Sequence, residues 1–120
     1  MAAVLIVDDN DAMRMVCRVN LEASGYRVLE AESASEAREA MESEAIALVL
    51  LDRRLLGADD GLVVAREIRE RHPGVAIVGI SGTVPVPEAF TDVVDASVTK
   101  PFGVDELLDT VGRFVPAPAR

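Results

Sequence analysis

Carboxylates stand at the ends of two apolar segments of this 120-residue chain. "AVLIV" (3–7) runs directly into Asp8 and Asp9, and "IALVLL" (46–51) runs into Asp52. Three carboxylates brought together repel one another unless a cation joins them, and a small site with oxygen ligands alone favours Mg²⁺. An aspartate can also attack phosphorus and form an acyl phosphate. These residue types therefore indicate magnesium-assisted phosphorylation of an aspartate.

Two further apolar segments end in groups that suit a phosphoryl ligand. Ser81 ends "VAIVGIS" (75–81), and Lys100 follows "ASVT" (96–99). The hydroxyl can donate a hydrogen bond to a phosphoryl oxygen, and the ammonium group neutralises its negative charge. We expect Asp52, which ends the third of five expected strands, to be the nucleophile of this set.

Each of these residues taken alone has an ordinary explanation. Asp8 and Asp9 would serve as a helix N-cap followed by a solvated acid. Ser81 belongs to a Ser-Gly pair that is common in turns, and a single lysine such as Lys100 is most often a surface residue. Asp52 would simply be the first polar residue of a loop. Their joint occurrence at the ends of successive apolar segments favours one functional site.

Strand and helix patterns alternate five times along the chain. The apolar runs lack an alternating polar face, which is typical of strands buried on both sides. Such alternation predicts an α/β domain with a parallel sheet, helices on both faces and right-handed crossovers. In such a sheet the functional crevice lies at the C-terminal ends of the strands. The expected strands are 3–7, 27–31, 46–52, 75–81 and 96–99, and the expected helices are 11–24, 33–43, 61–72, 87–94 and 104–115.

Local signals support several of these helices. Gly25 is expected to end the first helix. Ser33 and Glu36 form the pattern of a capping box at the start of the second, and Pro73-Gly74 stops the third. Inward faces are expected for two helices, with Met13, Val16, Cys17 and Leu21 on the first and Leu107, Leu108, Val111 and Val115 on the last.

Composition narrows the class of protein. The net charge is −9, with 21 acidic and 12 basic side chains, which argues against a nucleic-acid surface. Cys17 is the single cysteine, so an intramolecular disulfide is excluded, and we expect it to be a small core residue. The apolar segments are too short to cross a bilayer, and the N-terminus lacks a signal-peptide pattern. We therefore expect one small cytoplasmic, soluble domain in residues 1–115, without membrane association, and a flexible tail in 116–120.

Four motifs resemble the receiver domain of two-component response regulators, over essentially the whole chain. The resemblance implies a flavodoxin-like (βα)5 fold with strand order 2-1-3-4-5, as in a single-domain chemotaxis regulator. It implies a signalling switch rather than an enzyme. The motifs are "LIVDDNDAMR" (5–14), "VLLDRRLLGADDG" (49–61), "IVGISG" (77–82) and "VTKPF" (98–102).

The resemblance also implies roles for individual residues. Asp52 would accept phosphate from a histidine kinase or a histidine phosphotransfer protein. Asp8, Asp9 and Asp52 would together hold Mg²⁺. Lys100 would contact the phosphoryl group, and Ser81 would turn toward it. The domain is expected to be a monomer.

Arginines close to these motifs carry further expectations. The backbone carbonyl of Arg54 would complete the magnesium ligands, and its side chain, two residues after Asp52, is placed to obstruct a hydrolytic water. Arg53 is expected to be a solvated charge. Met13 and Arg14 open the first helix, where the family docks its phosphodonor. For this pair a docking role and an ordinary role, as core and surface residue respectively, both remain open.

Two departures from the family fall in the phosphoacceptor loop. Leu56 stands where the family usually has a proline. Gly61 comes one residue later than the family's glycine, so the loop carries one extra residue, Asp59 or Asp60.

Two more departures concern the usual output face. The segment 81–100 is shorter than usual by about one helical turn, and Pro85 and Pro87 fall where its helix would begin. Ser97 replaces the aromatic switch residue. We expect an intact site and a rebuilt output face.

Three functions stay open from the sequence. The first is a phospho-accepting switch, either a stand-alone domain or one part of a longer regulator. The second is a phosphate-independent interaction module, which the lack of an aromatic at Ser97 favours. The third is a magnesium-dependent phosphohydrolase, which Arg54 disfavours because many such enzymes carry an acid at that position. His72 is expected to mark a helix end remote from the site.

Overall fold

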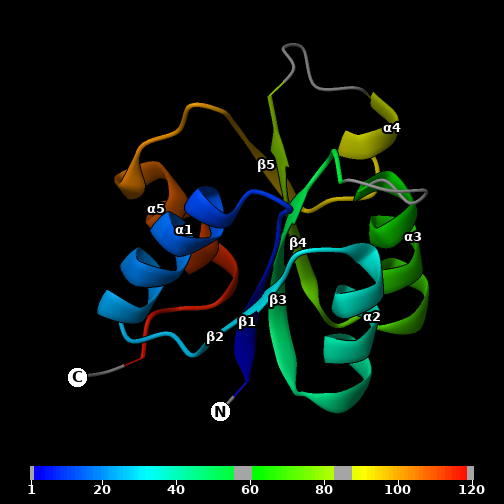
Figure 1. Ribbon diagram of the computed structural model, residues 1–120, viewed down its shortest axis with the longest axis horizontal. Helices are drawn as coiled ribbons and strands as arrows, with labels where there is room; N and C mark the ends of the chain where they lie inside the picture. Colours follow the sequence, from blue (N-terminus) through cyan, green and yellow to red (C-terminus); the bar gives the residue numbers. More distant parts are fainter. Residues whose placement is uncertain (1, 56–60, 83–87, 119–120) are drawn as a thin grey trace.

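The strands form one five-stranded parallel sheet. The computed structural model describes residues 2–55, 61–82 and 88–118. The strand order is β2-β1-β3-β4-β5, which confirms the predicted order 2-1-3-4-5 (Figure 1). The strands are β1 (Ala3–Val7), β2 (Val28–Ala31), β3 (Ile46–Asp52), β4 (Ala76–Ser81) and β5 (Ala96–Thr99).

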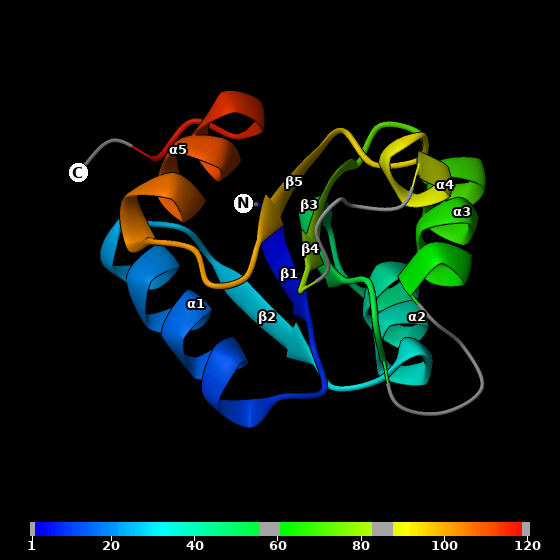
Figure 2. The ribbon, with the colours of Figure 1, turned by 90° about the horizontal axis from the view of Figure 1, so that it is seen from above.

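Helices cover both faces of the sheet. α1 and α5 lie on one face, and α2, α3 and α4 lie on the other, as Figure 2 shows from above. This arrangement confirms the α/β class. The helices are α1 (Asp11–Ala23), α2 (Ala34–Ser43), α3 (Gly61–Arg71), α4 (Glu88–Thr91) and α5 (Val104–Phe114).

The central strands contribute side chains to two apolar layers. In β1, Leu5 and Val7 pack with side chains of α2 and α3, whereas Val4 and Ile6 pack with side chains of α1 and α5. Successive strand residues point to opposite faces, and helices cover both faces, so every residue of β1 is buried. Burial on both sides explains the continuous apolar runs in the sequence. It also makes the ends of β1 and β3 a rigid support for polar residues.

Side chains cap the first two helices. The Asn10 side chain accepts a hydrogen bond from the Met13 amide at 2.9 Å, so Asn10 is the N-cap of α1. Ser33 Oγ accepts from the Glu36 amide at 3.2 Å, as the capping box predicts. The Glu36 carboxylate accepts from the amide of Glu32 at 3.0 Å, one residue before the partner that a capping box usually provides.

The element boundaries agree with the predicted ones to within one residue, except at the C-terminal end of α4. This helix ends at Thr91 rather than Val94, and the amides of Val93 and Val94 after it both donate to the carbonyl of Phe90. Gly25, with φ of 97°, follows the C-cap of α1 in a left-handed conformation that glycine adopts without strain.

The predicted inward orientation is wrong for one residue of α1, Val16. Val16 is 49% exposed, because it lies about 100° from Cys17 around the helix, beside the exposed Val19. Cys17 and Leu21 are fully buried as expected, and Met13 packs against the same layer. On α5, Leu107 and Val111 are buried, and Leu108 and Val115 pack against them.

Several sequence expectations concern residues outside the described ranges. They include the departure at Leu56, the extra loop residue at Asp59 or Asp60, and the prolines Pro85 and Pro87. Among the described residues, no helix has the length and apolarity needed to cross a membrane.

Candidate functional site

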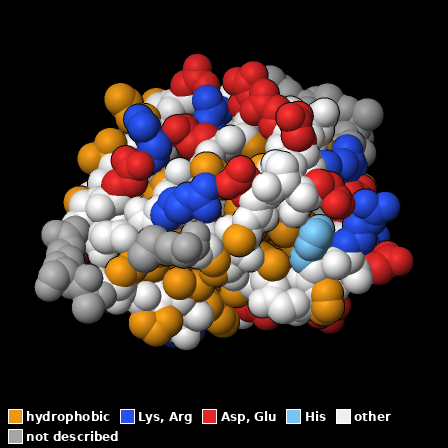
Figure 3. Space-filling model, turned by 90° about the horizontal axis from the view of Figure 1, so that it is seen from below, with side chains coloured by type: hydrophobic (Ala, Val, Ile, Leu, Met, Phe, Trp, Pro, Cys, Tyr) orange, Lys and Arg blue, Asp and Glu red, His pale blue; other side chains and the backbone are white. Residues whose placement is uncertain are grey.

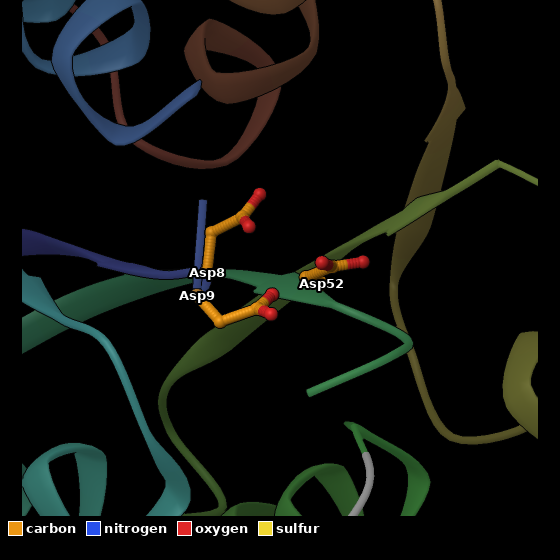
Figure 4. A group of neighbouring side chains, drawn as sticks. All are labelled: Asp8, Asp9 and Asp52. Atoms are coloured by element: carbon orange, nitrogen blue, oxygen red, sulfur yellow. The ribbon is translucent and has the colours of Figure 1, made fainter. Parts of the chain in front are cut away.

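Three carboxylates meet at the C-terminal edge of the sheet. Asp8 and Asp9 directly follow β1, and Asp52 is the last residue of the adjacent β3. One carboxylate oxygen from each of the three lies within 4.8 Å of the others. Figure 4 shows the three side chains gathered at this edge. The predicted acidic cluster is therefore present, because neighbouring parallel strands present their ends together.

Asp8 is the most buried acid of the cluster. Asp8 is fully inaccessible to solvent. Its Oδ1 accepts a hydrogen bond from the Asn10 amide at 2.9 Å. Its Oδ2 is buried without a hydrogen-bond partner in the described structure, and lies 3.7 Å from Lys100 Nζ. A buried carboxylate oxygen without a hydrogen bond is costly unless a cation satisfies it.

Asp52 lies in an environment that opposes its charge. It is 6% exposed, and its Oδ2 is 3.5 Å from Lys100 Nζ. Burial, followed by the negative charge of Asp8, raises the pKa of Asp52 to about 6, whereas Lys100 and the Arg54 amide act in the opposite direction. The Arg54 amide donates to Asp52 Oδ1 at 3.3 Å. A bound cation would relieve the repulsion between the two acids.

These residues fit a divalent cation. The ligands are hard oxygen donors, one of them is a buried oxygen that lacks a hydrogen bond, and the three acids carry more negative charge than Lys100 offsets. Mg²⁺ binds such groups and retains several water molecules. The carbonyl of Arg54 as a further ligand stays a prediction.

Ser81 and Lys100 also lie at this edge of the sheet. Ser81 is fully buried at the end of β4, and its carbonyl accepts from the Lys100 amide at 2.8 Å. This backbone bond continues the pairing of β4 with β5 past the strands. Asp8, Asp9, Asp52 and Lys100 therefore lie together at the edge of the sheet where β4 ends in Ser81, and the roles predicted for them stay predictions.

Arg53 does not match its expected role as a solvated charge. It is half-buried, and its Nε donates to Ser81 Oγ at 3.4 Å. Its amide also donates to the Ile80 carbonyl at 2.8 Å. The contact arises because β3 and β4 are adjacent, which the order of the strands decides. The neighbouring Arg54 is exposed.

Arg14 makes a contact with the site that the sequence did not indicate. Its Nη1 donates to the backbone carbonyl of Asp8 at 2.6 Å. An ion pair between Arg14 and Asp11 could be read from their spacing of three residues on a helix. The bond to Asp8 could not, because it depends on how the chain turns from β1 into α1.

His72 lies away from the acidic cluster. It follows α3, and its Nε2 is 4.0 Å from Glu42 Oε1 of α2. Figure 3 views the molecule from below, opposite to the direction of Figure 2, and shows a histidine at the surface. On that face the basic side chains lie scattered among acidic ones rather than in one patch.

The chain belongs to the response regulator receiver domain family, whose model matches residues 4–112. Its relatives include the hydrogenase transcriptional regulatory protein HoxA of Cupriavidus necator, which is 33% identical over 97% of this chain. The sensor kinase CckA of Brucella abortus is 36% identical over 95% of the chain. The chain spans 24% of the length of HoxA and 12% of the length of CckA.

Solved structures of receiver domains share the fold. The receiver domain of NtrX from Brucella abortus superposes with a TM-score of 0.88 at 30% identity, covering 96% of this chain and 99% of that one. The response regulator TrrA of Thermotoga maritima, solved in complex with Mg²⁺ and BeF, has the same TM-score and identity, with 96% and 100% coverage. Receiver domains are signalling domains of two-component systems that interact with histidine kinases, and sensor kinases themselves carry related domains.

Proposed function

We propose that this chain is a phospho-accepting receiver domain, switched by magnesium-dependent phosphorylation of Asp52. The phosphodonor is a histidine kinase or a histidine phosphotransfer protein. The observation that carries the proposal is the position of Asp52, which ends the central strand with Lys100 Nζ 3.5 Å away and two further acids beside it. Residues 1–115 form the receiver domain in this proposal, and 116–120 form a tail.

Asp52 supplies the nucleophile. A carboxylate oxygen of Asp52 forms a bond to phosphorus while the bond from phosphorus to the donor nitrogen breaks and its electron pair returns to the imidazole. The ionised form is needed, and with a pKa of about 6 most of Asp52 is ionised at neutral pH. Lys100, at 3.5 Å, favours this ionised form and is placed to offset charge on the phosphoryl oxygens.

Asp8, Asp9, Asp52 and the Arg54 carbonyl would hold Mg²⁺. The ion supplies positive charge that offsets the phosphoryl oxygens and the clustered carboxylates. Ser81, buried at the end of β4, has one hydroxyl proton that it can donate to a phosphoryl oxygen. Arg53 Nε donates to the oxygen of this hydroxyl at 3.4 Å, so the two side chains lie together beside Asp52 in the proposed site.

The first test is chemical phosphorylation with acetyl phosphate and Mg²⁺, followed by intact-mass measurement. The wild-type chain should gain a single phosphoryl group. Asp52→Asn should gain none, because it lacks the attacking oxygen, whereas Asp59→Asn and Asp60→Asn should still react. Labelling of Asp52→Asn to the wild-type level would contradict the assignment.

The same measurement separates the alternatives. Sustained release of phosphate without a stable adduct would favour the phosphohydrolase. No reaction at all would favour the phosphate-independent module, for which Ser97 is the supporting observation. Ser97 is exposed on β5 and offers no ring to move into or out of a pocket.

A second test concerns the magnesium ligands. We expect Mg²⁺ to raise the melting temperature of the wild-type protein, since a ligand that binds only the folded state stabilises it. The rise should largely disappear in Asp9→Ala, because two carboxylates joined by a cation bind it better than either alone. Differential scanning fluorimetry with increasing Mg²⁺ measures the effect. An equal rise in Asp9→Ala would place the metal elsewhere.

A further inference from the structure

The Arg14 side chain extends from α1 to the backbone of the first acid in the site. Its Nη1 donates to the Asp8 carbonyl at 2.6 Å, and only 12% of the side chain is exposed. A partly buried guanidinium group needs partners, and a hydrogen bond from such a charged donor is among the stronger ones in proteins. The short length of this bond and the burial of its donor mark it as a defined contact.

Two acids from different elements accept hydrogen bonds from the guanidinium group, and a third, Glu32, lies 3.9 Å from its Nη2. Asp11, one turn earlier on α1, pairs with Nη2. Glu30 of the edge strand β2 accepts from Nε at 3.2 Å. Because the guanidinium group is planar and its donors have a fixed geometry, these two contacts also fix the direction of Nη1. Arg14 therefore links α1, β2 and the end of β1.

All polar groups of Asp8 except Oδ2 make hydrogen bonds within the described structure. Its amide donates to the Ala31 carbonyl of β2 at 3.1 Å, and its Oδ1 accepts from the Asn10 amide at 2.9 Å. The carbonyl is held by Arg14. Only Oδ2 lacks a hydrogen bond in the described structure, and it lies toward Lys100.

The Asp8 carbonyl belongs to the peptide that joins Asp8 to Asp9. Since a peptide unit is planar, holding its carbonyl also fixes the amide of Asp9 and the direction in which the Asp9 Cα leaves. Both residues contribute to the acidic cluster with Asp52. A contact to one carbonyl thus governs the placement of two of the three carboxylates.

We propose that Arg14 is a positioning residue of the metal centre, which holds the Asp8–Asp9 peptide so that both carboxylates face Asp52. This inference rests on the proposed function for the identity of the metal. Residues that orient metal ligands typically affect metal affinity by about tenfold or more when they are replaced. The docking role considered for Arg14 stays a prediction beside this one.

Arg18 provides a matched control within the same helix. It lies one turn after Arg14 and its Nε is 3.1 Å from Glu30 Oε2, so it also joins α1 to β2. Its side chain is 40% exposed, and its charged partner among the described residues is Glu30 rather than any group of Asp8. Replacing Arg18 therefore removes a similar ion pair without removing the hold on the Asp8 carbonyl.

The test measures magnesium affinity by calorimetry for the wild type, Arg14→Gln, Arg14→Lys and Arg18→Gln. Arg14→Gln should weaken binding about tenfold, and Arg14→Lys should fall between it and the wild type, because an ammonium group can donate to the carbonyl but cannot bridge both acids. Arg18→Gln should bind like the wild type. At saturating Mg²⁺ the rate of phosphorylation of Arg14→Gln by acetyl phosphate should recover, since the loss lies in ion binding.

A second measurement needs no metal. In amide spectra of the metal-free protein, Arg14→Gln should shift the signals of Asp8, Asp9 and Asn10, and Arg18→Gln should not. Unchanged magnesium affinity in a folded Arg14→Gln, or equal losses in the Arg14 and Arg18 variants, would overturn the inference. If the wild type itself bound no Mg²⁺, the proposed function would fail, and the metal-free spectra would still decide whether Arg14 positions these residues.

Discussion

At the scale of single residues, the burial of Asp52 makes its ionised carboxylate costly to the folded state. The carboxylate is 6% exposed and lies beside Asp8 at the end of the most central strand. Its pKa of about 6, compared with 3.8 for an ordinary aspartate, means that folding shifts Asp52 toward its protonated form relative to the unfolded chain. A group of this kind stabilises the fold fully at low pH, and the contribution is lost as pH rises through its pKa.

The stability of the metal-free protein should therefore rise when Asp52 is replaced by asparagine. At pH 7.5 the wild type carries an ionised, buried Asp52, and Asp52→Asn should be more stable by on the order of 1–3 kcal/mol. The difference should shrink at pH 5.0, where most folded molecules have a protonated Asp52. Urea denaturation in EDTA at the two pH values measures it.

Addition of Mg²⁺ serves as the control for that prediction. The cation offsets the negative charge that destabilises the wild type, so the advantage of Asp52→Asn should decrease when Mg²⁺ is present. A metal-free variant less stable than the wild type at pH 7.5 would show that the carboxylate is better accommodated than its surroundings suggest.

At the scale of elements, the first residue of α3 packs tightly against the backbone at the end of β3. The Gly61 amide donates to the Arg53 carbonyl at 2.8 Å. A Cβ atom at Gly61 would lie 2.7 Å from Arg53 Cα and 2.8 Å from the Arg53 carbonyl oxygen, and would also meet the Asp52 carbonyl oxygen. The start of α3 is thus packed directly against the backbone that carries Asp52, and only glycine fits there.

Gly61→Ala should therefore destabilise the protein by about 1–3 kcal/mol, the usual cost of forcing extra atoms into a packed site. It should also slow phosphorylation of Asp52, because the backbone at Asp52 and Arg53 has to move. Thermal unfolding and labelling with acetyl phosphate measure the two effects. Gly74→Ala is the matched control: nothing lies within 4 Å of its Cβ position, so its stability should be equal or slightly higher.

The short helix α4 is held by one aromatic side chain. The Phe90 ring lies over Gly79 of β4, where an added Cβ would be 2.6 Å from its Cζ atom, and Phe90 is 1% exposed. Gly79 is paired with Ser97 on β5. This part of the molecule therefore has its aromatic ring on the helix, buried, while the strand position carries an exposed serine.

At the scale of the whole molecule, backbone bonds join the loops around the site. The Arg53 amide donates to Ile80, and the Lys100 amide donates to Ser81. A phosphoryl group on Asp52 would act first on these loops through its charge. Ser97 offers no large side chain that could carry the change farther along β5.

Beryllofluoride, a phosphoryl mimic, should therefore shift amide signals most strongly in 53–60 and 81–86. Signals of Ala96–Thr99 and of the outer face of α5 should change little, and the protein should remain monomeric. Amide spectra and size-exclusion chromatography with and without the mimic measure this. The Asp52→Asn protein, treated in the same way, controls for binding elsewhere. Strong dimerisation through α4, β5 and α5 would contradict the prediction.

Much of this architecture was determined by the sequence alone. Continuous apolar runs require strands buried on both faces, and their alternation with helical segments requires a parallel sheet. The ends of such strands meet at one edge, which is why the sequence predicts that Asp8, Asp9, Asp52, Ser81 and Lys100 lie near one another. These inferences succeed because they depend on periodicity and on the chain order of strands.

The tertiary structure decided how these residues are held. The contacts from Arg14 to Asp8 and from Arg53 to Ser81 join side chains to groups in other elements, and no local pattern encodes them. Val16 was assigned inward because it is apolar, although the direction in which α1 rests on the sheet leaves it exposed. Packing orientation and the directions of long side chains arise from the whole fold, so the sequence determined which residues meet and the structure determined what orients them.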